Sequence, residues 1–154
     1  MPYILLILLT YIPDRILKRH IEEDSEFTYP RELGDTGITL HRHHNYGFCM
    51  NRLEDHPGLV KGTVCGIYAA ALGYAGHQLL TRKEEKRSDQ LLLCSLALIL
   101  GGGLSNLTDR IRRGYVVDYF SLPIKPIRHV IMNIGDLGIF LGCLLMTIAG
   151  MAED

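Results

Sequence analysis

The chain has 154 residues, of which 16 are basic and 17 acidic, and its formal net charge at neutral pH is -1. This length is typical of a single domain with a sizeable core, and the balanced charge excludes a strongly basic nucleic-acid-binding protein. The 4 cysteines occur without CxxC or cysteine–histidine zinc spacing, which excludes a disulfide framework and a zinc site of that kind. Apolar residues gather in four runs with the charges between them, as in a small multi-pass membrane protein.

The first apolar run covers residues 3–12, and a helix is expected over about residues 1–20. The run is short for a span of roughly 20 residues and is followed by Asp14, so it crosses a bilayer only where a bundle satisfies that carboxylate. A signal peptide is the alternative. Against it, no Lys or Arg precedes the run and no small-x-small cleavage site follows it.

A polar segment comes next, and a small β cradle is expected over about residues 25–55. Within residues 37–48, Ile38 and Leu40 alternate with Thr39 and His41, which predicts a strand, and the preceding Gly34-Asp35-Thr36-Gly37 predicts a turn. The turn contains Asp-Thr-Gly, the signature of soluble aspartic proteases. Their β-rich fold needs a second such loop, and nothing around Asp35 supports one, so a hairpin turn is favoured.

Three histidines follow this turn, namely His41, His43 and His44. A carboxylate or cysteine at suitable spacing would be needed to complete a metal site with them, and the sequence offers none. The alternative, which we favour, is an exposed strand on which histidine and arginine alternate.

Three further helices are expected, at about residues 58–80, 90–108 and 130–152. The last shows almost no polar residue at helical period, which favours membrane spans over the core helices of a soluble bundle. The short, charged loop at 81–89 predicts a helical hairpin, and residues 108–129 are expected to form a longer loop broken by two prolines. Residues 1–154 are therefore expected to form a single membrane domain.

Glycines spaced by three or four residues, or in a row, occur in all three of these later runs. This spacing predicts helices that pack closely. The glycines are Gly62 and Gly66 in one run, Gly101 to Gly103 in the next, and Gly135, Gly138 and Gly142 in the last.

The polar residues at membrane depth fall on two short helical faces. Asn106, Asp109 and Arg110 are spaced i, i+3 and i+4, so they share one face at the end of a helix. Asn133 and Asp136 are spaced i and i+3 at the start of the next helix and also share a face. These two faces are expected to converge on one point.

Asp118 lies between these faces, within the apolar segment YVVDYF, and its natural partner is Asp136. Two carboxylates brought together at low dielectric cannot both ionise, so they share one proton. This is aspartic protease chemistry, in which one carboxylate deprotonates water and the other donates to the scissile carbonyl. A structural role is the alternative, with Asp136 capping a backbone or pairing with Arg110.

Several sequence blocks resemble the prolipoprotein signal peptidase family, bacterial signal peptidase II. SNLTDRIRRGYVVDYF (105–120) contains its Asn-x-x-Asp-Arg and Val-Val-Asp-Phe-like blocks, and MNIGD (132–136) is similar to its Phe-Asn-x-Ala-Asp block. PDRILK (13–18) resembles its Asp-Gln-x-x-Lys block, and HNYGFCM (44–50) its Asn-x-Gly-x-x-Phe block. The order and spacing of the blocks agree over the whole chain.

The resemblance implies an all-α membrane protein: four transmembrane helices with a small extracytoplasmic β-sheet cradle between the first two. It also implies a short amphipathic segment between the last two helices. The protein would be a multi-pass protein of the bacterial cytoplasmic membrane, with cytoplasmic termini and an active site near the extracytoplasmic face.

The resemblance also assigns roles to individual residues. It makes Asp118 and Asp136 the catalytic dyad of an aspartic endopeptidase that needs no metal or other cofactor. Residues that would bind the substrate are Asn45, Gly47, Asn106, Arg110 and Asn133. Residues that would support the site are Asp14, Lys18 and Asp109. The implied substrate is a diacylglyceryl-modified prolipoprotein, cut just before the lipidated cysteine by a monomer working in membrane lipid.

The chain departs from the family pattern at a few positions. Arg15 stands where Gln is usual, Met132 where Phe is usual and Gly135 where Ala is usual. Met50 stands at the Phe position of the Asn-x-Gly-x-x-Phe block, which we call the cradle block. Every acid and asparagine that the chemistry needs is present. We therefore expect the departures to change substrate preference more than activity.

Two other functions are weighed against this one. The first is a metal-dependent membrane phosphotransferase, suggested by Gly114 four residues before Asp118, but its motif needs another Asp at position 122, which is Leu. The second is a catalytically inactive protein of the same fold that binds or assembles lipoproteins. The presence of both Asp118 and Asp136 argues against it.

Overall fold

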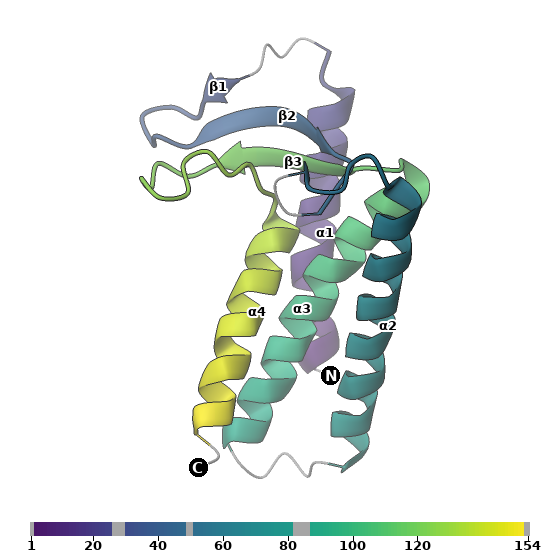
Figure 1. Cartoon of the computed structure of the whole chain (residues 1–154). Helices are drawn as coiled ribbons and strands as arrows, with labels where there is room; N and C mark the ends of the chain where they lie inside the picture. The colour runs from purple at the N-terminus through teal and green to yellow at the C-terminus, as the bar shows by residue number, and fades with distance from the viewer. Residues whose placement is uncertain (1, 26–29, 49–50, 82–86, 153–154) are drawn as a thin grey trace.

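The computed structural model describes residues 2–25, 30–48, 51–81 and 87–152. Met50 of the cradle block and residues 82–86 of the expected charged loop lie outside this part of the chain. The helices are α1 (Pro2–Glu23), α2 (Pro57–Thr81), α3 (Arg87–Arg112) and α4 (Ile134–Met151), and the strands are β1 (Arg31–Glu32), β2 (Thr39–Asn45) and β3 (Val116–Ser121). Figure 1 shows the helices as a bundle with the strands across one end, while the start of α1 and the end of α4 lie at the other.

α3 forms the centre of the bundle and packs against each of the other three helices. Its apolar side chains Leu92, Leu96 and Leu100 form one buried cluster with Ala75 of α2 and Ala149 of α4. The candidate site residues of α3, Asn106, Asp109 and Arg110, lie near its C-terminal end, and the sheet crosses the bundle at that end (Figure 1). The helix therefore carries its functional groups to the junction of bundle and sheet.

The outer faces of the bundle are apolar. Large exposed side chains include Leu5 and Leu9 of α1, Leu72 of α2, and Phe140 and Leu144 of α4. An apolar surface of this extent is typical of a face covered by a membrane or a partner. Within the described residues, α3 and α4 are the two helices that are long and apolar enough to cross a bilayer.

The sheet draws its strands from two distant parts of the chain. Its order is β1-β2-β3 and both pairs are antiparallel. The prediction that residues 108–129 form only a loop was wrong, because Val116–Ser121 pairs with β2 and every residue of that strand is buried. Valine and the aromatic residues of this segment favour strands. The third strand joins the α3–α4 connection to the α1–α2 connection.

The turn before β2 is formed as predicted. Gly34 and Gly37 both adopt positive φ, at 55° and 71°, and the Thr36 hydroxyl donates to the Leu33 carbonyl at 2.6 Å. Asp35 is exposed in this turn. The Asp-Thr-Gly sequence is therefore a local turn, remote from the junction of sheet and bundle.

Close helix packing is confirmed for the glycines of α3 and α4. A Cβ added to Gly102 would overlap the carbonyl oxygen of Gly135, and one added to Gly142 would lie 2.7 Å from the carbonyl oxygen of Ser95. The same prediction was wrong for Gly62 and Gly66 of α2. A Cβ there would have no atom of the described residues within 4 Å.

The contact between α3 and α4 gives the first testable prediction. Gly102→Ala should destabilise the protein by about 1–3 kcal/mol, because the new methyl group forces the two helices apart. Gly76→Ala on α2 is the matched control: its Cβ meets no described atom, and alanine favours helix over glycine by up to about 1 kcal/mol. Thermal unfolding in detergent should show a lower midpoint for the first variant only, and equal midpoints would contradict the packing.

Candidate active site

Asp118 lies on β3 and is buried, with 3% of its surface exposed. Its two carboxyl oxygens accept hydrogen bonds from neutral amides. The Nδ2 of Asn45 on β2 donates to one at 3.1 Å, and the Nδ2 of Asn133 donates to the other at 2.7 Å. Asp118 therefore has no cation among its hydrogen-bond partners in the described part of the chain.

Asp136 lies in the first turn of α4 and forms a capping box with Asn133. The Asp136 amide donates to Asn133 Oδ1 at 2.9 Å, and the Asn133 amide donates to an Asp136 carboxyl oxygen at 3.2 Å. The other carboxyl oxygen accepts from Nδ2 of Asn106 at 2.8 Å. The capping role that was weighed as an alternative is therefore present, while the partners of this carboxylate are amides and not Arg110.

Asn133 joins the two carboxyl groups. Its side chain is fully buried, and it bonds Asp118 through Nδ2 and the first turn of α4 through Oδ1. Burial, together with the charge of Asp136, raises the pKa of Asp118 from 3.8 to about 7. The structure therefore places the predicted pair close enough for the charge of one carboxyl group to affect the other.

Lys18 is the buried cation behind the pair. Its ammonium is fully buried and forms an ion pair with Asp14 at 2.7 Å and another with Asp109 at 3.4 Å. It also donates to Oδ1 of Asn106 at 2.7 Å. Because that bond fixes the amide of Asn106, the Nδ2 atom is oriented towards Asp136.

The two carboxylates beside Lys18 hold the surrounding elements. Asp14 accepts from the hydroxyl of Ser105 at 2.6 Å and from the hydroxyl of Tyr119 at 2.9 Å. Asp109 accepts from the main-chain amide of Val117 at 3.3 Å and also pairs with Arg15 of α1 and with Arg113, the residue after α3. These bonds tie α1, α3 and β3 together directly behind Asp118.

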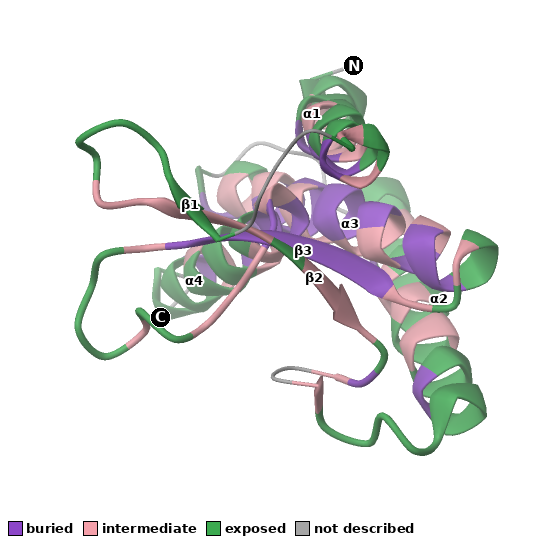
Figure 2. Cartoon of the chain, turned by 90° about the horizontal axis from the view of Figure 1, so that it is seen from above, coloured by how far each residue is buried: buried purple, intermediate pink, exposed green. Residues whose placement is uncertain are grey.

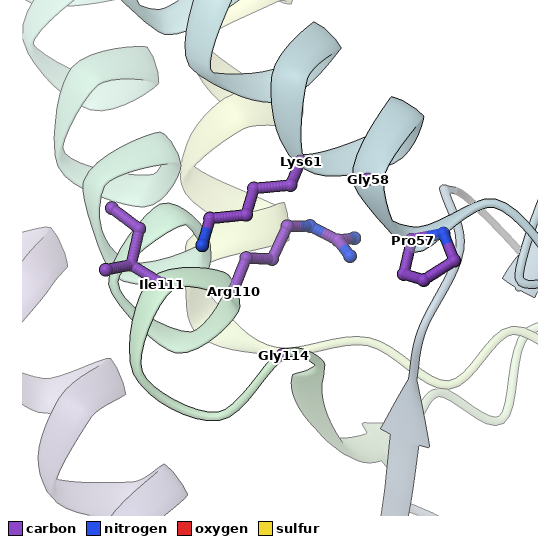
Figure 3. A pocket seen from close by; sticks show the side chains of 6 residues that line it. All are labelled: Pro57, Gly58, Lys61, Arg110, Ile111 and Gly114. Atoms are coloured by element: carbon purple, nitrogen blue, oxygen red, sulfur yellow. The ribbon is translucent and has the colours of Figure 1, made fainter.

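Arg110 follows Asp109 near the C-terminal end of α3, and 8% of its surface is exposed. Its guanidinium donates to the carbonyl oxygen of Gly47 at 2.5 Å. Figure 3 shows the guanidinium directed towards Pro57, where it lines with Lys61 a cavity of about 240 Å³. Gly47 has no room for a side chain, because a Cβ would overlap the carbonyl oxygen of Arg52.

The three departures from the family pattern that lie in the described residues have local partners. Arg15 pairs with Asp109. Met132 forms a β-bridge with Phe120, and its carbonyl oxygen accepts the Phe120 amide at 3.0 Å. Gly135 lies against Gly102 where α4 meets α3. Each of these residues therefore supports the frame around the two carboxylates.

The expectation of an exposed histidine strand was wrong. β2 is the central strand of the sheet, so its histidines are half-buried. His41 lies 2.9 Å from the Ser121 hydroxyl, and His44 lies 2.6 Å from Glu22 and stacks on Tyr115. No group of three or more metal-binding side chains occurs among the described residues.

Sequence reasoning missed the residues that bond the supporting carboxylates. Ser105 and Tyr119 are such residues, and each is adjacent in sequence to a predicted site residue. Burial raises the pKa of the Tyr119 hydroxyl, which stays a donor to Asp14 and accepts the Ile134 amide at 3.1 Å. The sequence did contain a signal for both residues: each is polar, lies in an apolar run and is adjacent to a predicted site residue.

The geometry can be compared with known proteins. The chain matches the family model of signal peptidase (SPase) II over residues 6–152. It is 32% identical to a lipoprotein signal peptidase of Salmonella paratyphi A over 123 residues, which are 77% of this chain and 72% of that protein. A lipoprotein signal peptidase of Escherichia coli O157:H7 is 31% identical over 123 residues, 77% of this chain and 73% of that protein.

The fold is that of two solved bacterial membrane enzyme structures. They match with TM-scores of 0.75 and 0.73, each at 20% identity, over 99% of this chain and 88% and 94% of theirs. The expected fold of four helices and a small sheet is thereby confirmed. The family model and the curated relatives confirm the resemblance drawn from the sequence blocks, and we conclude that the chain belongs to the signal peptidase II family.

Proposed function

We propose that Asp118 and Asp136 are the catalytic dyad with which this chain cuts its substrate. As a signal peptidase II, the chain is an aspartic peptidase that cleaves the signal peptides of prolipoproteins. The observation that carries the dyad is the buried pair of carboxyl groups joined by Asn133. Both groups accept hydrogen bonds from amides alone among the described residues, so the pair can hold and transfer a single proton.

The reaction follows from this arrangement. The carboxyl pair binds a water molecule, one member takes its proton, and the other donates a proton to the scissile carbonyl oxygen. Asn106 and Asn133 hold Asp136 in place, while Asn45 does so for Asp118. No step needs a metal ion.

Arg110 and Gly47 form the proposed substrate-binding wall. The guanidinium is fixed by the Gly47 carbonyl and faces the cavity (Figure 3), where it can donate a hydrogen bond to a substrate carbonyl oxygen. The proposed substrate carries diacylglycerol on the cysteine after the scissile bond. Apolar faces of the helices below the sheet support access for those acyl chains from surrounding membrane lipid.

We also propose how the chain sits in a bacterial cytoplasmic membrane. It forms a single membrane domain in which all four helices cross, and it acts as a monomer. The start of α1 and the end of α4 lie at the end of the bundle opposite the sheet (Figure 1), which supports cytoplasmic termini and an extracytoplasmic site.

The phosphotransferase alternative has weak support in this site. Asp14 and Asp109 are held by Lys18 and arginines, so they are already neutralised and are poor candidates for magnesium ligands. Asp118 and Asp136 are each bonded at both oxygens by amides. A binding protein without activity would not require a shared proton at this place.

The dyad is tested by isosteric substitution. Asp118→Asn and Asp136→Asn should each lower cleavage of a diacylglyceryl-modified prolipoprotein by at least about 10³-fold, because a neutral amide cannot exchange the proton. Asp35→Asn, in the exposed Asp-Thr-Gly turn, is the control and should keep full activity. Cleavage is followed by gel shift to the mature lipoprotein, with and without EDTA. Substantial cleavage by either dyad variant, or its loss with EDTA in the wild type, would contradict the proposal.

The raised pKa of Asp118 gives a pH prediction. A pKa of about 7 means that the pair loses its shared proton as the pH rises through 7, so kcat/KM should fall with a midpoint near that pH. The folded protein holds this proton more tightly than the unfolded chain, where the pKa is about 3.8. Stability should therefore also fall as the pH rises from about 4 to about 7, and unfolding of Asp118→Asn in detergent should show a smaller fall. A flat kcat/KM profile from pH 5 to 9 would argue against a shared proton.

Lys18 is proposed to support the site by neutralising two carboxylates. Lys18→Met should destabilise the protein by about 3–5 kcal/mol, because Asp14 and Asp109 then remain buried without their ammonium partner. Lys18→Met with Asp14→Asn should recover part of that loss, since Asp14 is then neutral and Asp109 keeps its arginine partners. Thermal unfolding in detergent measures both. A double variant no more stable than the single one would show that charge balance is not the cause.

A further inference from the structure

His43 lies next to Asp118 in the sheet. The two residues are direct register partners on β2 and β3. Directly opposed residues of antiparallel strands project to the same face, with Cβ atoms about 4.5–5.5 Å apart. Asn45 follows two positions later on the same face and donates to Asp118. His43 and Asn45 therefore border the Asp118 carboxyl together, from the β2 side.

Both side chains carry a buried polar atom that has no hydrogen-bond partner. Within the part of the chain that the structure describes, Nδ1 of His43 and Oδ1 of Asn45 are the two buried side-chain atoms in this state. Leaving such atoms unpaired is costly, so native structures satisfy nearly all of them. Two unpaired atoms on one face beside one carboxyl group point to a ligand that supplies the missing partners.

The neighbouring histidines show that this is not a general property of β2. His41 is paired with the Ser121 hydroxyl, and His44 is paired with Glu22 on the face that meets α1. His44 is the register partner of Val117, whose side chain packs with Ile21 of α1, so it projects away from Asp118. His43 thus differs from both of them by facing the proposed dyad with an unpaired nitrogen.

The two unpaired atoms match a peptide main chain. Asn45 Oδ1 can only accept, and a neutral imidazole donates from whichever nitrogen carries the proton. A residue of an extended peptide offers one N–H donor and one carbonyl acceptor. One such residue can therefore pair with both Asn45 Oδ1 as acceptor and His43 Nδ1–H as donor, which project from alternate positions of β2.

We propose that His43 is a substrate-binding residue that, with Asn45, holds the main chain of the prolipoprotein beside the scissile bond. The Nδ1–H of His43 donates to a substrate carbonyl oxygen, and Oδ1 of Asn45 accepts from a substrate N–H. This inference rests on the proposed function, since it places the peptide against the dyad. It adds a main-chain contact from β2 to the contact expected from Arg110.

The test uses three substitutions that separate the two ring nitrogens. His43→Leu keeps the approximate shape and removes both nitrogens, His43→Asn keeps an N–H donor near the place of Nδ1, and His43→Gln keeps one near the place of Nε2. His41→Leu, on the same strand, is the matched control. Each purified variant is assayed with the diacylglyceryl-modified prolipoprotein, and its thermal unfolding is measured in the same detergent.

A main-chain contact made equally in the bound substrate and in the transition state affects KM and leaves kcat unchanged. His43→Leu should therefore raise KM about tenfold with kcat within about threefold of wild type, as expected for one lost hydrogen bond. His43→Asn should restore KM to within about threefold, and His43→Gln should resemble His43→Leu. His41→Leu should keep the wild-type KM.

A second measurement separates this inference from the proposed function. Binding of a fluorescent prolipoprotein to the inactive Asp136→Asn protein should weaken about tenfold when His43→Leu is added. Unchanged KM and binding in His43→Leu, or equal behaviour of His43→Asn and His43→Gln, would overturn the role of His43 while the wild type still cleaves. A loss of kcat with unchanged KM would overturn it as well. Failure of the wild type to cleave would instead contradict the proposed function itself.

Discussion

The fully buried ammonium of Lys18 is the interaction on which the site depends. One positive charge at this depth compensates the buried carboxylate of Asp14, and it shares the compensation of Asp109 with two arginines. Asp14 in turn fixes the hydroxyl of Tyr119 beside Asp118, and Lys18 itself fixes the amide that bonds Asp136. Charge balance between α1 and α3 is therefore transmitted to both proposed catalytic groups.

The partners of the four buried carboxylates divide them into two kinds. Asp14 and Asp109 are held by cations, so they serve the structure as ion-pair partners. Asp118 and Asp136 are held by asparagine and main-chain amides, so their protonation state can change during a reaction. This difference in partners explains how one small bundle can contain structural and reactive carboxylates within a few residues of each other.

The helices and most of the proposed site could be predicted from the sequence, because hydrophobic runs and i, i+3 spacing are local signals. Asn106 and Asp136 are an example: each lies on the helical face inferred for it, and they bond each other. The strand at Val116–Ser121 could not be predicted in this way, since its pairing with β2 links segments about 75 residues apart. The open surface at Gly62 was missed for a related reason, because glycine spacing does not say which neighbour is present.

The distance between the two proposed catalytic groups is set by a short β-bridge more than by the bundle. Asp118 belongs to the sheet and Asp136 to the first turn of α4, and the chain between them leaves β3 and returns beside it at Met132. The Met132 amide donates to the Phe120 carbonyl at 2.8 Å, so the residue before Asn133 is fixed to the residue two after Asp118. The side chain of Asn133 then bonds Asp118 and caps α4. Both carboxyl groups are therefore positioned by the main-chain bridge at Met132 and by the Asn133 side chain, and side-chain changes on the outer helix faces need not disturb them.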